Sequence, residues 1–255
     1  MYPILFKIGP LTIHTYGALV AVGFLVGLSL AVKLAKKQGI PGEKILDLGV
    51  YLLVSAIIGS RLLFVLIEYK YYIKNPLNIF KLWEGGLVFF GGLLAALPVA
   101  IFYLRKNAIP LWSTLDIFAP AIAIGHAIGR LGCFSAGCCH GKITYLPWGI
   151  TFIHPESLAI RGIPLHPTQL YEAFSEFMVF IFLLLWQRHK SYDGELFGLY
   201  ILLYSLSRFI IEFFRGDEMR GFIFKGFSTA QGISVLLFLG AIIFMIIRRR
   251  SNYGK

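Results

Sequence analysis

Seven charged residues stand inside or at the ends of stretches that are otherwise apolar: Arg61, Arg130, Arg208, Asp116, Glu172, Glu176 and Glu212. A cation in the middle of a bilayer costs at least ~2.5 kcal/mol, so such residues usually face a partner or an internal polar cavity. Ion pairing among three cations and four anions is one interpretation. The other is a cavity that binds an anion, because arginine pairs bidentately with phosphate and keeps its charge when desolvated.

The positions of these residues favour the cavity. Arg130 and Arg208 lie toward one end of their apolar stretches, and other polar residues are expected at the same depth: His14, Tyr16, Arg61, His166, Gln169, Tyr171 and Glu172. Scattered ion pairs would have no reason to share one leaflet. We therefore expect a site at the outer headgroup level that binds a phosphate carried on a lipid.

The composition indicates which elements must position these residues. The chain has 255 residues, of which 57% are hydrophobic and 15% charged, with a mean hydropathy of +0.74. Soluble domains carry about 25% charged residues, and disordered chains are poor in aromatic and aliphatic residues, so both classes are excluded. We predict an all-α polytopic membrane protein, residues 1–255 forming a single integral membrane domain. Its seven transmembrane helices are expected at Leu11–Val32 and at about 46–68, 85–104, 114–134, 167–187, 195–214 and 227–247.

The basic residues predict the orientation of these helices. With the N-terminus outside, the inner segments carry 12 cations in about 35 residues and the outer ones nine in about 70. Cytoplasmic segments are enriched in Lys and Arg, which favours an extracytoplasmic N-terminus and a cytoplasmic C-terminus. The net charge of +11 is then a topology signal, and no nucleic-acid partner is expected. The longest stretch between spans, about 135–166, is predicted to be a small extracytoplasmic cap between helices four and five.

The stretch Gly129–Gly141, which is expected to end a helix in a glycine-rich turn, contains three cysteines and a histidine: Cys133, Cys138, Cys139 and His140. Their spacing lacks the paired C-x-x-C of tetrahedral zinc sites, so we expect no metal and no cofactor. No sequence signature marks a nucleophilic cysteine, and small soft packing residues are the simplest interpretation. Farther along, Pro167 suits the first position of a helix. His166 is therefore either a site residue or an interfacial residue at the helix entry.

Seven motifs together resemble the prolipoprotein diacylglyceryl transferase family. They are HTYG (His14–Gly17), GSR (Gly59–Arg61), GGLVFFGGL (Gly85–Leu93), DIFAP (Asp116–Pro120), GRLGCF (Gly129–Phe134), HPTQLYE (His166–Glu172) and RFIIEFFRGDE (Arg208–Glu218). They occur in order from about residue 3 to residue 247. The resemblance implies a seven-helix enzyme of the bacterial cytoplasmic (inner) membrane. It also implies transfer of the diacylglyceryl group of phosphatidylglycerol to the lipobox cysteine of a preprolipoprotein, which releases glycerol 1-phosphate.

The resemblance also implies roles for individual residues. Arg130 matches the arginine that binds the phosphatidylglycerol head group in the family, and Arg208 matches an essential arginine. His166 is a further candidate catalytic residue. The expected substrate-binding residues fall on the motif positions; they are Arg130, Arg61, Tyr16, His14, Gln169, Tyr171, Glu172, Glu212 and Arg215.

Two departures from the family pattern affect the mechanism. Phe90 stands where the family often has a histidine that is proposed to activate the substrate thiol, and Cys133 and Cys138 stand where other members carry Asn and Glu. The thiolate would displace glycerol phosphate at the glycerol carbon, while Arg130 and Arg208 stabilise the charge on the departing phosphate. The proton acceptor stays open among His166, Tyr16 and solvent.

Two other function classes compete with this interpretation. A transporter or channel for an anionic solute could use the same arginines, but transporters often contain inverted repeats, and no repeat is found in this sequence. A structural membrane protein is disfavoured by the number of charges within the spans.

Overall fold

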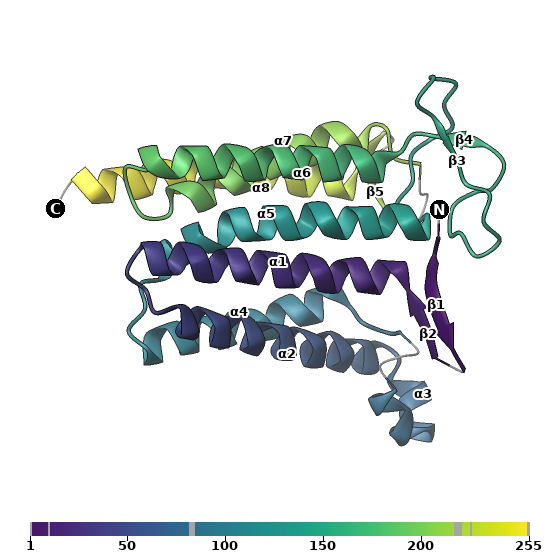
Figure 1. Ribbon diagram of the computed structural model, residues 1–255, viewed down its shortest axis with the longest axis horizontal. Helices are drawn as coiled ribbons and strands as arrows, with labels where there is room; N and C mark the ends of the chain where they lie inside the picture. The colour runs from purple at the N-terminus through teal and green to yellow at the C-terminus, as the bar shows by residue number, and fades with distance from the viewer. Residues whose placement is uncertain (1, 10, 82–84, 217–220, 225, 254–255) are drawn as a thin grey trace. The chain divides into compact units, whose positions relative to one another are not determined.

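The computed structural model describes residues 2–9, 11–81, 85–216, 221–224 and 226–253, and helices dominate it (Figure 1). Six helices among these residues are long and apolar enough to cross a membrane. They are α1 (Thr15–Lys37), α2 (Gly42–Ile67), α4 (Phe89–Lys106), α5 (Leu111–Ala136), α6 (Thr168–Trp186) and α8 (Thr229–Tyr253). Large apolar side chains on them are exposed, such as Leu25 at 61% and Leu236 at 72%, as expected where lipid is the solvent. The chain is a multi-pass helical membrane protein.

The sixth predicted span is also a helix, α7 (Glu195–Glu212). Its 18 residues include three charged ones, Glu195, Arg208 and Glu212, and it is not among the six apolar helices. At 1.5 Å per residue it is about 27 Å long, close to the thickness of the hydrocarbon core. A seventh crossing therefore stays a prediction. Shorter helical pieces are α3 (Tyr69–Lys74), η1 (Pro76–Phe80) and η3 (Gln187–His189).

The chain divides into two compact units. The larger unit comprises residues 1–31 and 115–255, and the smaller unit comprises residues 32–114. The prediction of a single membrane domain is not tested by this division.

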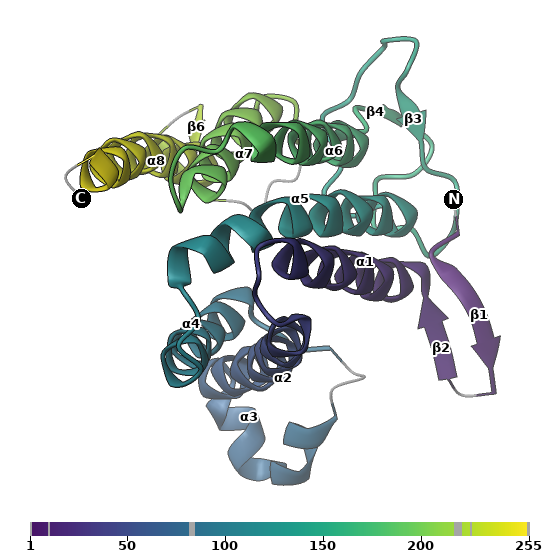
Figure 2. The same cartoon turned by 60° about the vertical axis from the view of Figure 1, so that its left-hand side comes forward.

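Small residues bring α1 and α5 together in the larger unit. Gly23 and Gly27 of α1 face Gly125 and Ala121 of α5, and a Cβ atom built on either α1 glycine would lie 2.7 Å from a backbone oxygen of α5. Figures 1 and 2 show the two helices side by side. Paired small residues four apart allow close backbone approach in membranes, where packing supplies much of the association energy.

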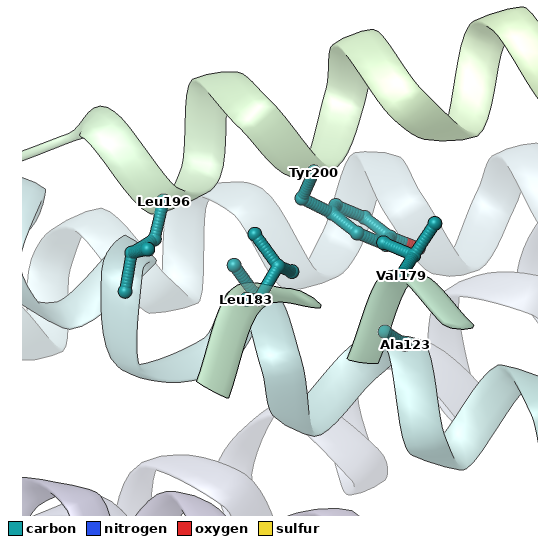
Figure 3. Packing of buried hydrophobic residues seen from close by; sticks show 6 residues of the cluster. Ala123, Val179, Leu183, Leu196 and Tyr200 are labelled. Carbon is teal, nitrogen blue, oxygen red and sulfur yellow. The ribbon is translucent and has the colours of Figure 1, made fainter. Parts of the chain in front are cut away.

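A buried apolar cluster joins α5, α6 and α7 (Figure 3). It comprises Ala119 and Ala123 of α5, Val179 and Leu183 of α6, and Leu196 and Tyr200 of α7. Together with the α1–α5 contact, this cluster fixes the helices that carry the site described below.

Asp116 on α5 is fully buried and holds the beginning of α7. Its carboxylate accepts hydrogen bonds from the backbone N–H groups of Gly194 at 2.8 Å and Phe197 at 3.0 Å, and Lys190 lies 3.1 Å away. A carboxylate at a helix N-terminus satisfies unpaired N–H groups and complements the helix dipole. Of the seven charges in apolar stretches, Asp116 therefore positions a helix.

The expectation of a mostly helical membrane protein is confirmed, and short antiparallel strand pairs accompany the helices. They pair β1 (Ile4–Ile8) with β2 (Leu11–His14), β3 (Ile150–Thr151) with β4 (Pro164–Leu165), and β5 (Phe222–Phe224) with β6 (Phe227–Ser228). Strands of two to five residues are too short for an alternating pattern to stand out in an apolar chain. The first hairpin also delays the start of α1 from the predicted Leu11 to Thr15.

The predicted cap, residues 135–166, is a folded segment with a small core. Phe152, Ala159 and Leu165 are buried together, and Phe134 and Ile150 pack against them. The side of the membrane on which this segment lies stays a prediction.

In the smaller unit, α2 and α4 also pack through small residues. Gly59 and Gly91 face each other so closely that a Cβ atom on either would collide with the backbone of the other helix. This contact holds α2, and with it Arg61, against α4.

The α1–α5 contact predicts a stability difference between two glycine positions. We expect Gly27→Leu to lower stability by about 1–3 kcal/mol, because the new side chain must force the helices apart. Gly240→Leu on α8 is the matched control, since nothing lies within 4 Å of its Cβ position. Thermal unfolding of both variants in detergent measures the effect, and equal melting temperatures would contradict the described packing.

Candidate active site

Three arginines meet one buried carboxylate in the larger unit. Glu172, in the second turn of α6, lies 2.5 Å from Nε of Arg130 through Oε2. Its Oε1 accepts hydrogen bonds from Nη1 of Arg208 at 2.5 Å and from Nη1 of Arg215 at 3.1 Å. The side chain of Glu172 is 6% exposed, and those of Arg130 and Arg208 are 16% and 15% exposed. Charge-assisted hydrogen bonds are short and strong, and two of them together with the ion pair to Arg130 hold α5, α6 and the end of α7 together at one carboxylate.

A second carboxylate orients Arg208. Its Nη2 lies 3.0 Å from Oε2 of Glu212, one turn later on α7. Glu212 is fixed in turn by the hydroxyl of Ser228, which donates to its Oε1 at 2.9 Å. The guanidinium of Arg208 thus spans two buried carboxylates, which sets the plane of its fork.

His126 and Glu176 extend the cluster, and sequence reasoning did not place either in the site. Nε of Arg130 also donates to Nε2 of His126 at 3.1 Å, and His126 Nδ1 lies 3.7 Å from Oε1 of Glu176. His126 precedes Arg130 by four residues on α5, so the helical spacing is the signal that could have found it. Beside them is a small cavity of about 10 Å³, lined by His126, Glu172, Ser175, Glu176, Tyr204, Ser207, Arg208 and Ile211.

The loop that follows α5 is held by two other segments of the larger unit. Gln169 and Thr168, at the start of α6, donate side-chain hydrogen bonds to the carbonyls of Cys138 at 2.6 Å and Cys139 at 2.7 Å. On the other side, Lys142 N–H donates to the carbonyl of Phe214, and Gly216 N–H donates to that of His140. Gln169, a predicted substrate-binding residue, therefore positions this loop.

His166 and Tyr171 lie together at the entry to α6. Nδ1 of His166 lies 3.1 Å from the hydroxyl of Tyr171, which also accepts from Nε1 of Trp148 at 2.9 Å. Burial, and then the nearby charge of Lys142, lower the pKa of His166 below its ordinary 6.5. His166 is therefore neutral near pH 7, which is the form that accepts a proton.

His14 and Tyr16 lie where β2 passes into α1, and both are exposed. The backbone of Tyr16 runs close to α5, because a Cβ atom on Gly132 would lie 3.2 Å from the Tyr16 carbonyl oxygen. This places Tyr16 against the same end of α5 that carries Arg130.

Arg61 lies in the smaller unit and is buried among backbone oxygens. Nε donates to the carbonyl of Ile79, while Nη1 and Nη2 donate to those of Gly85, Gly86, Asn78 and Lys81. All five N–H groups are thus engaged. The guanidinium also lies over the rings of Phe64 and Tyr72. Arg61 binds η1, Lys81 and the Gly85–Gly86 pair to α2, and its part in substrate binding stays a prediction.

Two further features of the sequence analysis are Phe90 and the end of the motif Arg208–Glu218. Phe90, at the first turn of α4 in the smaller unit, is 62% exposed. The last two residues of the motif Arg208–Glu218 lie outside the described residues.

Comparison with known proteins identifies the family. The family model described as prolipoprotein diacylglyceryl transferase matches residues 3–247. The chain belongs to the prolipoprotein diacylglyceryl transferase family. Among relatives named phosphatidylglycerol–prolipoprotein diacylglyceryl transferase, that of Clostridium tetani is 36% identical over 253 residues, 99% of this chain and 100% of the relative. Those of Bacillus velezensis and Geobacillus kaustophilus are 36% and 37% identical over 99% and 97% of this chain, and over 94% and 93% of their own lengths. The resemblance drawn from the seven motifs is thereby confirmed, and the chain is a transferase of this family.

For this family member, the geometry at Glu172 predicts how its removal acts. Glu172→Gln leaves three buried guanidinium groups without their common counter-charge, and we expect a loss of about 3–5 kcal/mol in stability. Added anionic phospholipid should raise the melting temperature of Glu172→Gln more than that of the wild type, because it supplies the missing charge. Glu156→Gln is the matched control, since Glu156 forms an exposed ion pair with Lys7 that is worth about 1 kcal/mol or less. Equal stability of both variants in thermal unfolding would refute the central role of Glu172.

The environment of His166 predicts a pH effect. Lys142→Gln removes a cation that opposes protonation, so the pKa of His166 should rise toward its ordinary value. Titration of the His166 ring by NMR measures this shift. If His166 accepts the substrate proton, a higher pKa of its ring also shifts the acidic limb of the pH–rate profile to higher pH. The reason is that the ring then becomes protonated, and loses its ability to accept a proton, at a higher pH. Lys7→Gln serves as the control. An unchanged titration of the His166 ring in Lys142→Gln would contradict the effect of the Lys142 charge on His166.

Proposed function

We propose that the site around Glu172 binds the phosphate of phosphatidylglycerol and transfers the diacylglyceryl group to the lipobox cysteine of a preprolipoprotein. Glycerol 1-phosphate is released in this first step of lipoprotein maturation. The observation that carries the proposal is the convergence of Arg130, Arg208 and Arg215 on one buried carboxylate. A relative's name supplies the substrates, and the arginines supply the chemistry that recognises the lipid phosphate.

The arginines outnumber the carboxylates that contact them. Three guanidinium groups face the carboxylates of Glu172 and Glu212, while a third carboxylate, that of Glu176, lies 3.7 Å from His126. The phosphodiester of phosphatidylglycerol carries one negative charge. The lipid phosphate would thus give the guanidinium groups a further anionic partner, and the carboxylates would hold these groups in orientation before it arrives.

The same arginines serve the reaction. When the substrate thiolate attacks the glycerol carbon, the C–O bond to the phosphate breaks and a second negative charge develops on the departing glycerol phosphate. Arg130 and Arg208 stabilise that charge, and fixed donors of this kind are usually the largest single contribution to catalysis. Arg215, Gln169, Tyr171, His14 and Tyr16 are proposed to line the bound substrates, and His166, Tyr16 or solvent takes the thiol proton.

The ends of the helices support a location at the headgroup level. Arg130 lies in the last turns of α5, Glu172 in the second turn of α6 and Arg208 near the end of α7. Because α5 and α7 end where α6 begins, these three residues lie at the same end of the helix bundle (Figure 1). We propose seven crossings with the N-terminus outside and the C-terminus in the cytoplasm. The site and the cap of residues 135–166 then face outward, where a lipobox precursor would meet them.

The proposal predicts a loss of transfer when either catalytic arginine is shortened. Arg208→Lys cannot span both Glu172 and Glu212, and we expect a loss of kcat of ~100-fold or more, as for removal of one preorganised donor. Arg130→Ala should abolish transfer while the protein still inserts. The assay uses detergent-purified full-length protein, phosphatidylglycerol and a lipobox peptide, with mass spectrometry of the lipidated peptide.

Arg161→Ala, in the exposed part of the predicted cap, is the matched control and should retain wild-type transfer. Wild-type rates in Arg130→Ala would refute the assignment. Flux of an anionic solute into liposomes, with no lipidated peptide formed by the wild type, would favour a transporter instead.

A further inference from the structure

The three cysteines of the chain form a cluster, called here the thiol cluster, beside the arginine site. Cys133 comes from the last turn of α5, and Cys138 and Cys139 from the loop that follows. Their Sγ atoms all lie within 4.8 Å of one another. Sulfur ligands lie about 2.3 Å from Zn²⁺, so three sulfur atoms at this spacing can share one ion after small rotations of their side chains.

The backbone of the loop is held in a form that collects these thiols. Cys139 has a φ of +59°, in the left-handed region that residues other than glycine seldom adopt, and Gly137 has a φ of +79°. Such conformations persist only where surrounding structure enforces them, and they concentrate at functional sites. Gln169 and Thr168 hold the loop in this conformation by donating hydrogen bonds to the carbonyls of Cys138 and Cys139.

The spacing of the cysteines in the sequence disfavours a zinc site, but the fold brings their three sulfur atoms together. The left-handed turn brings Cys138 and Cys139 back toward Cys133, so no paired C-x-x-C is needed. Among the described residues, no fourth histidine, cysteine or carboxylate joins the three sulfur atoms. Nδ1 of the neighbouring His140 is directed at the carbonyl of Gly141, 3.0 Å away. Three protein ligands and an open fourth position distinguish catalytic zinc sites from structural ones.

A guanidinium group lies close to the thiol cluster along the chain. Arg130 precedes Cys133 by three residues on α5. Three residues of helix correspond to about 4.5 Å along the axis, so a ligand on the thiol cluster and a phosphate on Arg130 would be neighbours.

We propose that Cys133, Cys138 and Cys139 bind Zn²⁺ and that the open fourth position takes the lipobox thiol of the substrate as a thiolate. This inference rests on the proposed function. It gives the reaction a means of activating the thiol, because a thiol that coordinates zinc loses its proton. The thiol cluster thus becomes the binding site for the nucleophile, and the arginines become the binding site for the leaving group.

The reaction balances without an oxidant or reductant. The substrate thiol binds zinc and releases its proton to solvent. The zinc-bound sulfur then forms a C–S bond with the glycerol carbon, while the C–O bond breaks and its electron pair passes to the phosphate oxygen. Glycerol 1-phosphate leaves with one more negative charge than the lipid phosphate had. The neutral thioether is a weaker zinc ligand than the thiolate, so it dissociates and frees the fourth position.

Metal analysis and a cobalt spectrum test this proposal on the purified full-length protein in detergent. After treatment with a chelator and reconstitution with Zn²⁺, we expect one zinc ion per chain. The Co²⁺-substituted protein should show sulfur-to-cobalt charge-transfer absorption, which should intensify when a lipobox peptide is added. A peptide with serine in place of its cysteine should leave the spectrum unchanged. Chelation should lower transfer ~100-fold or more, and Zn²⁺ should restore it.

Two variants separate zinc binding from folding. Asparagine tolerates the left-handed region, so Cys139→Asn should keep the wild-type melting temperature of the metal-free protein yet lose zinc and the cobalt spectrum. Ser135→Ala is the matched control, because Ser135 lies on the last turn of α5 with Cys133 and its hydroxyl donates to the carbonyl of Leu131. It should keep both zinc and transfer.

The outcomes distinguish the two proposals. Undiminished transfer by protein that contains no metal would overturn the zinc site and leave the proposed function standing. Zinc bound by the three cysteines in a protein that lipidates no peptide would overturn the proposed function and the role of the open position.

Discussion

The buried carboxylate of Glu172 is the interaction on which the active end of this molecule depends. Three guanidinium groups can lie among apolar helices only if a counter-charge is present, and Glu172 supplies it to all three at once. The helices that carry Arg130 and Arg208 must therefore converge on α6. Ion pairing and anion binding, which the sequence presents as alternatives, are compatible, because the three arginines outnumber the two carboxylates that contact them.

Other charges near the membrane have a structural task. Asp116 satisfies the first N–H groups of α7, and the guanidinium of Arg61 satisfies five backbone carbonyls in the smaller unit. Both solve the same physical problem, since backbone polar groups without partners are costly where water is absent. Asp116 and Arg61, which bind backbone groups, thus belong to the scaffold, whereas the charges around Glu172 form the candidate active site.

The helices were largely predictable because an apolar stretch of about 20 residues has few alternatives. A helix occupies each predicted span, although α1 begins later because Leu11–His14 pairs with Ile4–Ile8. Arg130, Arg208 and Glu172 were identifiable because charges are rare in such stretches. The thiol cluster was not, because it depends on left-handed backbone at Gly137 and Cys139. The carbonyls around Arg61 were equally hidden, since no side-chain pattern encodes them.

The position of the lipid head group can be measured in an experimental structure of the full-length protein with bound phosphatidylglycerol. We expect phosphate oxygens within hydrogen-bonding distance of the guanidinium groups of Arg130 and Arg208, with Glu172 still bound to at least one of them. A head group located elsewhere, with all three arginines still on Glu172, would contradict this expectation.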